Sequence, residues 1–229
     1  MLILGLTKTT LLDYPGHVSA TVFTGGCNFR CPFCHNGQMV LNPVGMEKIS
    51  EKEVMEHLLR RKNVLEGVCI TGGEPTIHSD LPEFIAKIKE LGYLVKLDTN
   101  GTHPAMLNEL IESSMIDYVA MDIKNSFTKY ADTASCNESM LKNIADSIDI
   151  LLSGKVDYEF RTTVIKELHT EEDFLQIDEM IEGAKRYFIQ SYVESDNVIQ
   201  KGFTAYSKEE LEKMVSCMKN VKPVLRGIE

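Results

Sequence analysis

The chain has 229 residues, of which 43% are apolar and 25% are charged, and it carries a formal net charge of −10. This composition is typical of a globular protein, and no apolar run approaches the roughly 20 residues that a membrane-spanning helix needs. The acidic excess opposes contact with a phosphate backbone, which argues against nucleic acid as a partner.

The N-terminal residues MLILGLTKTTLLDYPG lack the basic segment, the long apolar run and the small-residue cleavage site of a secretion signal. We therefore expect a cytoplasmic protein, in which cysteines are more often ligands, nucleophiles or core residues than disulfides. Three of the six cysteines are clustered. We interpret the scattered Cys69, Cys136 and Cys217 as ordinary structural residues, with Cys69 in the core.

Short β-branched segments alternate along the chain with segments of helical spacing. The predicted strands are residues 18–23, 64–71, 93–98, 116–123, 158–165 and 186–192. The predicted helices are residues 49–62, 81–91, 104–112, 139–152, 171–184 and 207–219. Strands and helices in alternation form parallel βα units. The sequence therefore predicts an α/β fold, a partial or closed (β/α)6 barrel rather than a doubly wound sheet, in a single domain spanning residues 1–229.

Two of these helices begin with capping boxes, in which Ser50 precedes Glu53 and Ser207 precedes Glu210 by three residues. The ends of the predicted strands carry the motifs GGCN, TGGEP, DTNG, MDIK, FRTT and IQSY. In parallel α/β folds the loops at the C-terminal strand ends converge on one face. We therefore predict one composite active site at that face.

Cys27, Cys31 and Cys34 form a CxxxCxxC motif on the loop after the first predicted strand. Three thiolates suit a soft metal centre. A structural zinc site needs four ligands, for which His35 is the nearest candidate, and a CxxC redox pair leaves Cys27 without a role. Ferredoxin clusters take four cysteines, so three donors to a four-iron cluster leave one iron open. We favour the open-site cluster, with the zinc and redox interpretations as alternatives.

This motif, with Phe33 before its last cysteine and a GGE segment after the next strand, resembles that of the radical S-adenosylmethionine (SAM) superfamily. The resemblance implies a [4Fe-4S] cluster whose open iron is chelated by the amino and carboxylate groups of SAM. One electron then cleaves SAM to methionine and a 5′-deoxyadenosyl radical, which abstracts hydrogen from a substrate.

The resemblance also implies the residues that bind SAM. Gly72, Gly73 and Glu74 would hold its ammonium group, although the same segment could form only a tight turn. Phe33 and His35 would lie against the adenine, although Phe33 could be a core aromatic residue.

Further SAM ligands are implied by the DTNG turn, which contains Asp98, Thr99 and Asn100, and by the DxK motif of Asp122 and Lys124. In activases of glycyl radical enzymes the matching Asp and Thr and the later Asp surround the methionine carboxylate, in part through a monovalent cation.

Two residues further along the chain, Arg161 and Gln190, lie in the motifs of the last two predicted strands. Arg161 would reach the SAM carboxylate or ribose, or else form a structural salt bridge. We interpret Gln190 as a hydrogen-bonded amide at the barrel mouth.

Over most of its length the chain is similar to the activating proteins of anaerobic ribonucleoside-triphosphate reductases, which are close to pyruvate formate-lyase activating enzymes. This implies hydrogen abstraction from a glycine Cα of a partner reductase, with flavodoxin or ferredoxin as electron donor. No cysteine occurs between Asn36 and Val68, which argues against auxiliary clusters. The alternatives are an activase of another glycyl radical enzyme, a radical SAM enzyme acting on a small molecule, and a zinc-binding interaction module.

Overall fold

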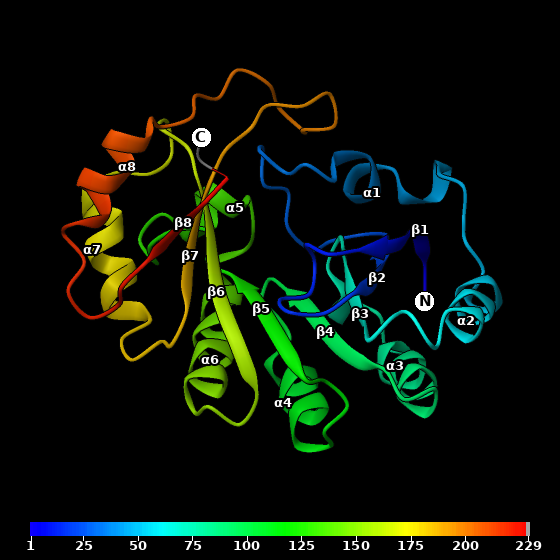
Figure 1. Ribbon diagram of the computed structural model, residues 1–229. Helices are drawn as coiled ribbons and strands as arrows, with labels where there is room; N and C mark the ends of the chain where they lie inside the picture. Colours follow the sequence, from blue (N-terminus) through cyan, green and yellow to red (C-terminus); the bar gives the residue numbers. More distant parts are fainter. Residues whose placement is uncertain (228–229) are drawn as a thin grey trace.

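The six segments predicted to be strands all form strands in the computed structural model, which describes residues 1–227. They are β2 (Ser19–Thr24), β3 (Gly67–Gly72), β4 (Leu94–Thr99), β5 (Tyr118–Asp122), β6 (Asp157–Val164) and β7 (Tyr187–Ser191). Each pairs in parallel with the next along the chain. A doubly wound sheet would reverse its strand order partway across, and this sheet does not. The prediction of a partial parallel barrel is confirmed (Figure 1).

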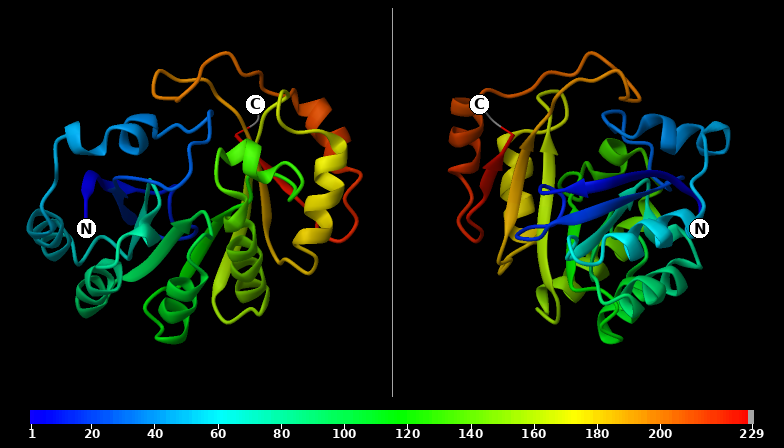
Figure 2. Two further views of the ribbon diagram at one scale, coloured as in Figure 1. Left: turned by 180° about the vertical axis from the view of Figure 1, so that it is seen from behind. Right: turned by 45° about the vertical axis from the view of Figure 1, so that its right-hand side comes forward.

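Two strands that the sequence analysis missed form the edges of this sheet. β1 (Ile3–Thr10) pairs antiparallel with β2, and β8 (Val224–Arg226) pairs in parallel with β7. Within residues 1–227, β1 and β8 do not pair with each other, so the barrel stays open along one side (Figure 2).

The helices cover the outer face of the curved sheet (Figures 1 and 2). The six predicted helices correspond to α2 (Glu51–Arg60), α3 (Leu81–Glu90), α4 (Pro104–Glu112), α6 (Leu141–Leu152), α7 (Glu171–Met180) and α8 (Lys208–Val215). Two short helices that were not predicted, α1 (Gly37–Leu41) and α5 (Tyr130–Ala134), lie in the loops after β2 and β5. No helix among the described residues is long and apolar enough to cross a bilayer.

The caps place the starts of two helices where the sequence indicated. Ser207 and Glu210 form the predicted capping box of α8. Ser50 accepts the backbone N–H of Glu53 at the start of α2, so it is the N-cap of that helix. The return hydrogen bond from the Ser50 N–H to Glu53 is not found within residues 1–227, so only half of the capping box predicted there forms.

The C-terminal edge strand is held to the barrel by an ion pair at the N-terminal end of the sheet. Glu159 on β6 is almost fully buried, and Arg226 on β8 donates to both of its carboxylate oxygens, at 2.9 and 3.1 Å. The Tyr118 hydroxyl donates to the same carboxylate at 2.9 Å. This ion pair therefore ties the edge strand β8 to β6, at the end of the sheet opposite the loops of the predicted site.

Candidate active site

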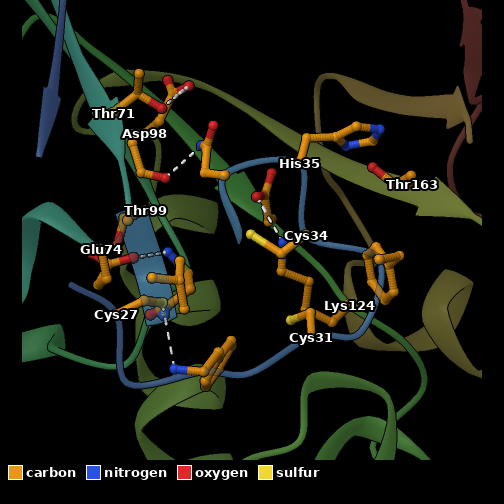
Figure 3. A pocket seen from close by; sticks show the side chains of 18 of the residues that line it. Cys27, Cys31, Cys34, His35, Thr71, Glu74, Asp98, Thr99, Lys124 and Thr163 are labelled. Atoms are coloured by element: carbon orange, nitrogen blue, oxygen red, sulfur yellow. Dashed lines mark hydrogen bonds and ion pairs between the residues drawn. The ribbon is translucent and has the colours of Figure 1, made fainter. Parts of the chain in front are cut away.

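A pocket of about 250 Å³ opens at the C-terminal ends of the parallel strands, where the sequence predicts a composite site (Figure 3). It is lined by all the residues that the sequence analysis assigned to the cluster or to SAM: Cys27, Cys31, Phe33, Cys34, His35, Gly72, Gly73, Glu74, Asp98, Thr99, Asn100, Asp122, Lys124 and Arg161. The fold therefore brings these residues together. Their individual roles follow from the contacts that each one makes.

The three clustered cysteines lie on the loop between β2 and α1, and all six cysteines of the chain are free thiols. The Cys34 N–H donates to the Cys31 carbonyl, and the Phe29 N–H donates to Cys27 Sγ at 3.3 Å. Burial raises the pKa of Cys27 to about 11 and that of Cys31 to about 12. Because a thiolate is the metal ligand, iron must displace protons from thiols that are otherwise neutral.

The three thiols line one pocket, and thiolates are the donors that iron–sulfur clusters take. Among the described residues, no three Cys, His, Asp or Glu side chains lie close enough together to hold one metal ion. In a mononuclear zinc site every sulfur lies about 2.3 Å from the same ion. In a four-iron cluster each cysteine bonds a different iron, which spreads the sulfur atoms apart. Apolar side chains of Phe29, Phe33 and Val40 line the same pocket and limit water around the thiols. The donor set therefore fits a cluster with one iron left open.

The cluster loop is held in place by a strap formed by residues 193–206, which follows β7. The Gly37 N–H donates to the Asn197 carbonyl at 3.1 Å, and the Gln200 N–H donates to the Pro32 carbonyl at 2.7 Å. A Cβ atom on Gly37 would lie only 2.5 Å from the Asn197 carbonyl oxygen, so this approach requires glycine. The strap therefore fixes both ends of the segment that carries Cys34.

The His35 ring is anchored by the same strap. Its Nε2 lies 2.7 Å from the Val193 carbonyl oxygen, and its ring centroid lies 5.8 Å from that of Tyr192. Phe33 is buried in the core and also lines the pocket. The contacts of Phe33 and His35 with adenine remain predictions.

The glycines of the GGE segment pack against the backbone that leads into the cluster loop. A Cβ on Gly73 would lie 1.8 Å from the Gly26 carbonyl oxygen, and one on Gly72, where φ is +109°, would lie 2.5 Å from the Thr24 nitrogen. Glycine is therefore required at both positions by the chain's own close packing. The tight turn that the sequence analysis weighed is present, and it fixes the distance between the GGE segment and the cysteines.

Glu74 links this turn to the DTNG turn after β4. Its Oε1 accepts hydrogen bonds from the Thr76 N–H and from the hydroxyls of Thr76 and Thr99, and its Oε2 accepts one from the Asn100 N–H. Burial raises the pKa of Glu74, and these hydrogen bonds oppose the rise. Oε1 thus accepts three hydrogen bonds and Oε2 one, so Oε2 is the less occupied of the two oxygens.

Asp98, Asp122 and Arg161 form a charged row across β4, β5 and β6. Arg161 donates from Nε to Asp122 at 3.0 Å and from Nη1 to Asp98 at 3.1 Å, and Lys124 contacts Asp122 at 2.9 Å. Burial alone would raise the pKa of both carboxyls, but Arg161 and the neighbouring lysines outweigh it and hold both pKa values below the usual range. The structural salt bridge considered for Arg161 is therefore present. Its Nη2 makes no hydrogen bond with the described residues and is free for a ligand.

Lys96 is a residue of this row that the sequence analysis missed. It is 2% exposed, forms an ion pair with Asp98, and lies 3.6 Å from Cys69 Sγ. Cys69 is fully buried, as predicted for a core residue. A lysine within the apolar strand run YLVKLD was the available signal, because a buried lysine needs a partner.

Two further polar residues of the pocket, Thr163 on β6 and Gln190 on β7, stand opposite each other in the strand register. Neither side chain makes a hydrogen bond with the described residues, so the hydrogen-bonded amide expected for Gln190 is not found within residues 1–227. The pocket thus has a charged, internally paired part on β4 to β6 and a neutral, unpaired part on β6 and β7.

Comparison with known proteins agrees with this site. The Radical SAM superfamily pattern matches residues 21–181. The chain is 37% identical over 202 residues to a protein of Methanocaldococcus jannaschii provisionally named a glycyl-radical enzyme activating enzyme, with 85% of this chain and 81% of that protein covered. It is 33% identical over 123 residues to the pyruvate formate-lyase-activating enzyme of Clostridium pasteurianum, with 50% and 49% covered.

Among solved structures, Streptococcus suis SuiB bound to S-adenosylmethionine superposes with a TM-score of 0.63 at 16% identity, covering 88% of this chain. The present chain spans 48% of the SuiB chain, and the likeness shows a shared fold. The family pattern covers most of the chain, and its cysteines and GGE segment line one pocket. The chain therefore belongs to the radical SAM superfamily, whose enzymes use a [4Fe-4S] cluster and S-adenosylmethionine.

Proposed function

We propose that this enzyme activates a glycyl radical enzyme by removing a hydrogen atom from a glycine Cα of its partner. The observation that carries the proposal is the identity of 37% to a relative named for that activity, over most of both chains. The pocket supports it, because the thiols and the row of Asp98, Asp122 and Arg161 line one cavity that opens at the barrel mouth. A partner loop can reach a site at the mouth, whereas it could not reach a closed interior.

When bound, the reduced cluster supplies one electron that splits the C5′–S bond of SAM, giving methionine and a 5′-deoxyadenosyl radical. We propose that Cys27, Cys31 and Cys34 hold the cluster. Glu74 accepts from the SAM ammonium group, and Arg161 donates to its carboxylate through the free Nη2. The remaining assigned residues complete the SAM site: Phe33, His35, Gly72, Gly73, Asp98, Thr99, Asn100, Asp122 and Lys124. A monovalent cation near Asp98 and Asp122 remains part of the proposal.

With cluster and SAM bound, the site would remove a hydrogen atom from the partner glycine, which would give 5′-deoxyadenosine and a glycyl radical. We propose an anaerobic ribonucleoside-triphosphate reductase as the partner, on the strength of the LDYPG lead-in and the CHN sequence that closes the cluster loop. Flavodoxin or ferredoxin would supply the electron. We further propose that residues 1–229 act as one radical SAM domain in the cytoplasm.

The test is activation under argon. Reconstituted protein, dithionite, SAM and a purified anaerobic reductase should give the doublet of a glycyl radical in electron paramagnetic resonance. If the doublet forms only with pyruvate formate-lyase, that enzyme replaces the reductase as the partner. Absence of a doublet with every glycyl radical enzyme in a panel, while a small molecule stimulates SAM cleavage, would overturn the proposed function.

A further inference from the structure

In the neutral part of the pocket two side chains make no hydrogen bond at all within residues 1–227, whereas the charged, amide and hydroxyl side chains around the rest are each paired at least once. Thr71 donates to Asp98 at 3.2 Å, and Asn36 donates to the Gly72 carbonyl at 2.6 Å. The ionic side chains and the DTNG turn are paired in the same way. Thr163 and Gln190 make no side-chain hydrogen bond within residues 1–227, although both line the cavity. Both side chains are only partly buried, so their donors and acceptors face the cavity and are available to a ligand bound there.

The two side chains come from neighbouring strands and share one face of the pocket. Thr163 and Gln190 are register partners in the β6–β7 ladder, so their side chains point to the same side of the sheet. Figure 3 shows Thr163 on the His35 side of the cavity, across from Glu74. The pair therefore lies apart from the Glu74 carboxylate, to which we assign the SAM ammonium group.

The chemistry of the pair indicates what it binds. A carboxamide offers two N–H donors and a carbonyl acceptor, and a hydroxyl can donate or accept. This neutral set matches a peptide unit, which presents one N–H and one C=O. Glycine has no side chain, so an enzyme that acts on a glycine residue can recognise it only through its backbone.

We propose that Gln190, assisted by Thr163, binds the backbone amide next to the glycine from which hydrogen is taken. This inference rests on the proposed function and names the specificity residues of its substrate site. Two hydrogen bonds to a peptide unit would hold the Cα in line with the nucleoside radical, because abstraction needs the reacting atoms about 3 to 3.5 Å apart.

The test measures glycyl radical spins formed per 5′-deoxyadenosine, with the anaerobic reductase as probe. Gln190→Leu keeps the size of the side chain and removes its hydrogen bonds, and Thr163→Val does the same for the hydroxyl. We expect the ratio to fall on the order of tenfold in Gln190→Leu and less in Thr163→Val, as for the loss of a substrate hydrogen bond. Gln176→Leu, on the outer helix α7 and outside this pocket, is the matched control and should keep the wild-type ratio.

Three outcomes separate the possibilities. A wild-type ratio in Gln190→Leu overturns the inference and leaves the proposed function standing. An unchanged ratio with a raised KM for SAM also overturns the inference, because Gln190 would then bind SAM and not the partner glycine. Failure of the wild-type protein to activate any glycyl radical enzyme overturns the proposed function together with the inference.

Discussion

Arg161 and Asp122 form an ion pair inside the pocket, with Nε 3.0 Å from the carboxylate and the side chains 16% and 31% exposed. The same guanidinium also reaches Asp98. We predict that Arg161→Gln lowers the free energy of unfolding by about 2 to 4 kcal/mol, because it leaves two partly buried carboxylates without their shared partner. Urea unfolding under anaerobic, reducing conditions measures this.

Arg186→Gln is the matched control for that substitution. Arg186 pairs with Asp157 at 3.8 Å on the surface, where both side chains are exposed, so its loss should cost less than about 1 kcal/mol. Equal losses in the two variants would contradict the role given to Arg161.

The same pair predicts a pH dependence. The pKa values of Asp98 and Asp122 are held below the usual range in the folded state, despite burial, by Arg161 and the neighbouring lysines. Their stabilisation is therefore present above the unfolded value of about 3.9 and is lost as the pH falls through the lower folded values. In Arg161→Gln the lysines remain but the guanidinium is lost, so both pKa values should lie higher than in the wild type, and acid should destabilise the variant less. We expect the stability gap between the two proteins to narrow in urea titrations as the pH falls below about 4. A gap that widens would contradict the assignment.

The contact between the GGE segment and the cluster loop gives a steric prediction. In Gly73→Ala the new Cβ would meet the Gly26 carbonyl at 1.8 Å, so the two loops must separate and iron retention should fall. Gly92→Ala is the control, since its φ is +86° and no atom lies within 4 Å, and it should cost only about 1 kcal/mol of backbone strain. Iron content after reconstitution distinguishes them, and equal retention in both would refute the packing argument.

The attachment of β8 through Arg226 and Glu159 is tested at the end of the sheet opposite the pocket. Arg226→Gln leaves Glu159 buried without its cation, and we expect a loss of about 2 to 3 kcal/mol because Arg226 itself is partly exposed. The double variant with Glu159→Gln removes the stranded charge and should regain at least part of that loss in thermal unfolding. A double variant less stable than Arg226→Gln alone would show that the charge is not the cause.

Much of the fold followed from local pattern. β2 to β7 are short β-branched runs separated by amphipathic helices, so their existence and order were predictable, and the C-terminal strand ends located the pocket. The edge strands were not predictable by the same argument. β8 has three residues and no periodicity, and β1 belongs to an antiparallel hairpin outside the βα repeat.

The pocket residues that belong to a sequence motif were predictable. Those whose role depends only on tertiary contacts were missed. Lys96 looked like one polar residue in an apolar strand, and its pairing with Asp98 depends on side-chain direction inside the barrel. The Gln190 amide was expected to be hydrogen-bonded, because a sequence does not reveal which amides find partners in the folded chain. Gly73 carried the right motif, but the atom that demands glycine belongs to Gly26, some fifty residues earlier.

The most direct measurement is the yield of 5′-deoxyadenosine from SAM by anaerobically reconstituted, dithionite-reduced protein. Wild-type protein and Cys217→Ala, whose thiol lies at the end of α8 outside the pocket, should both produce it. Cys31→Ala should produce none above background. Continued production by Cys31→Ala would contradict the assignment of the three clustered thiols as the cluster ligands.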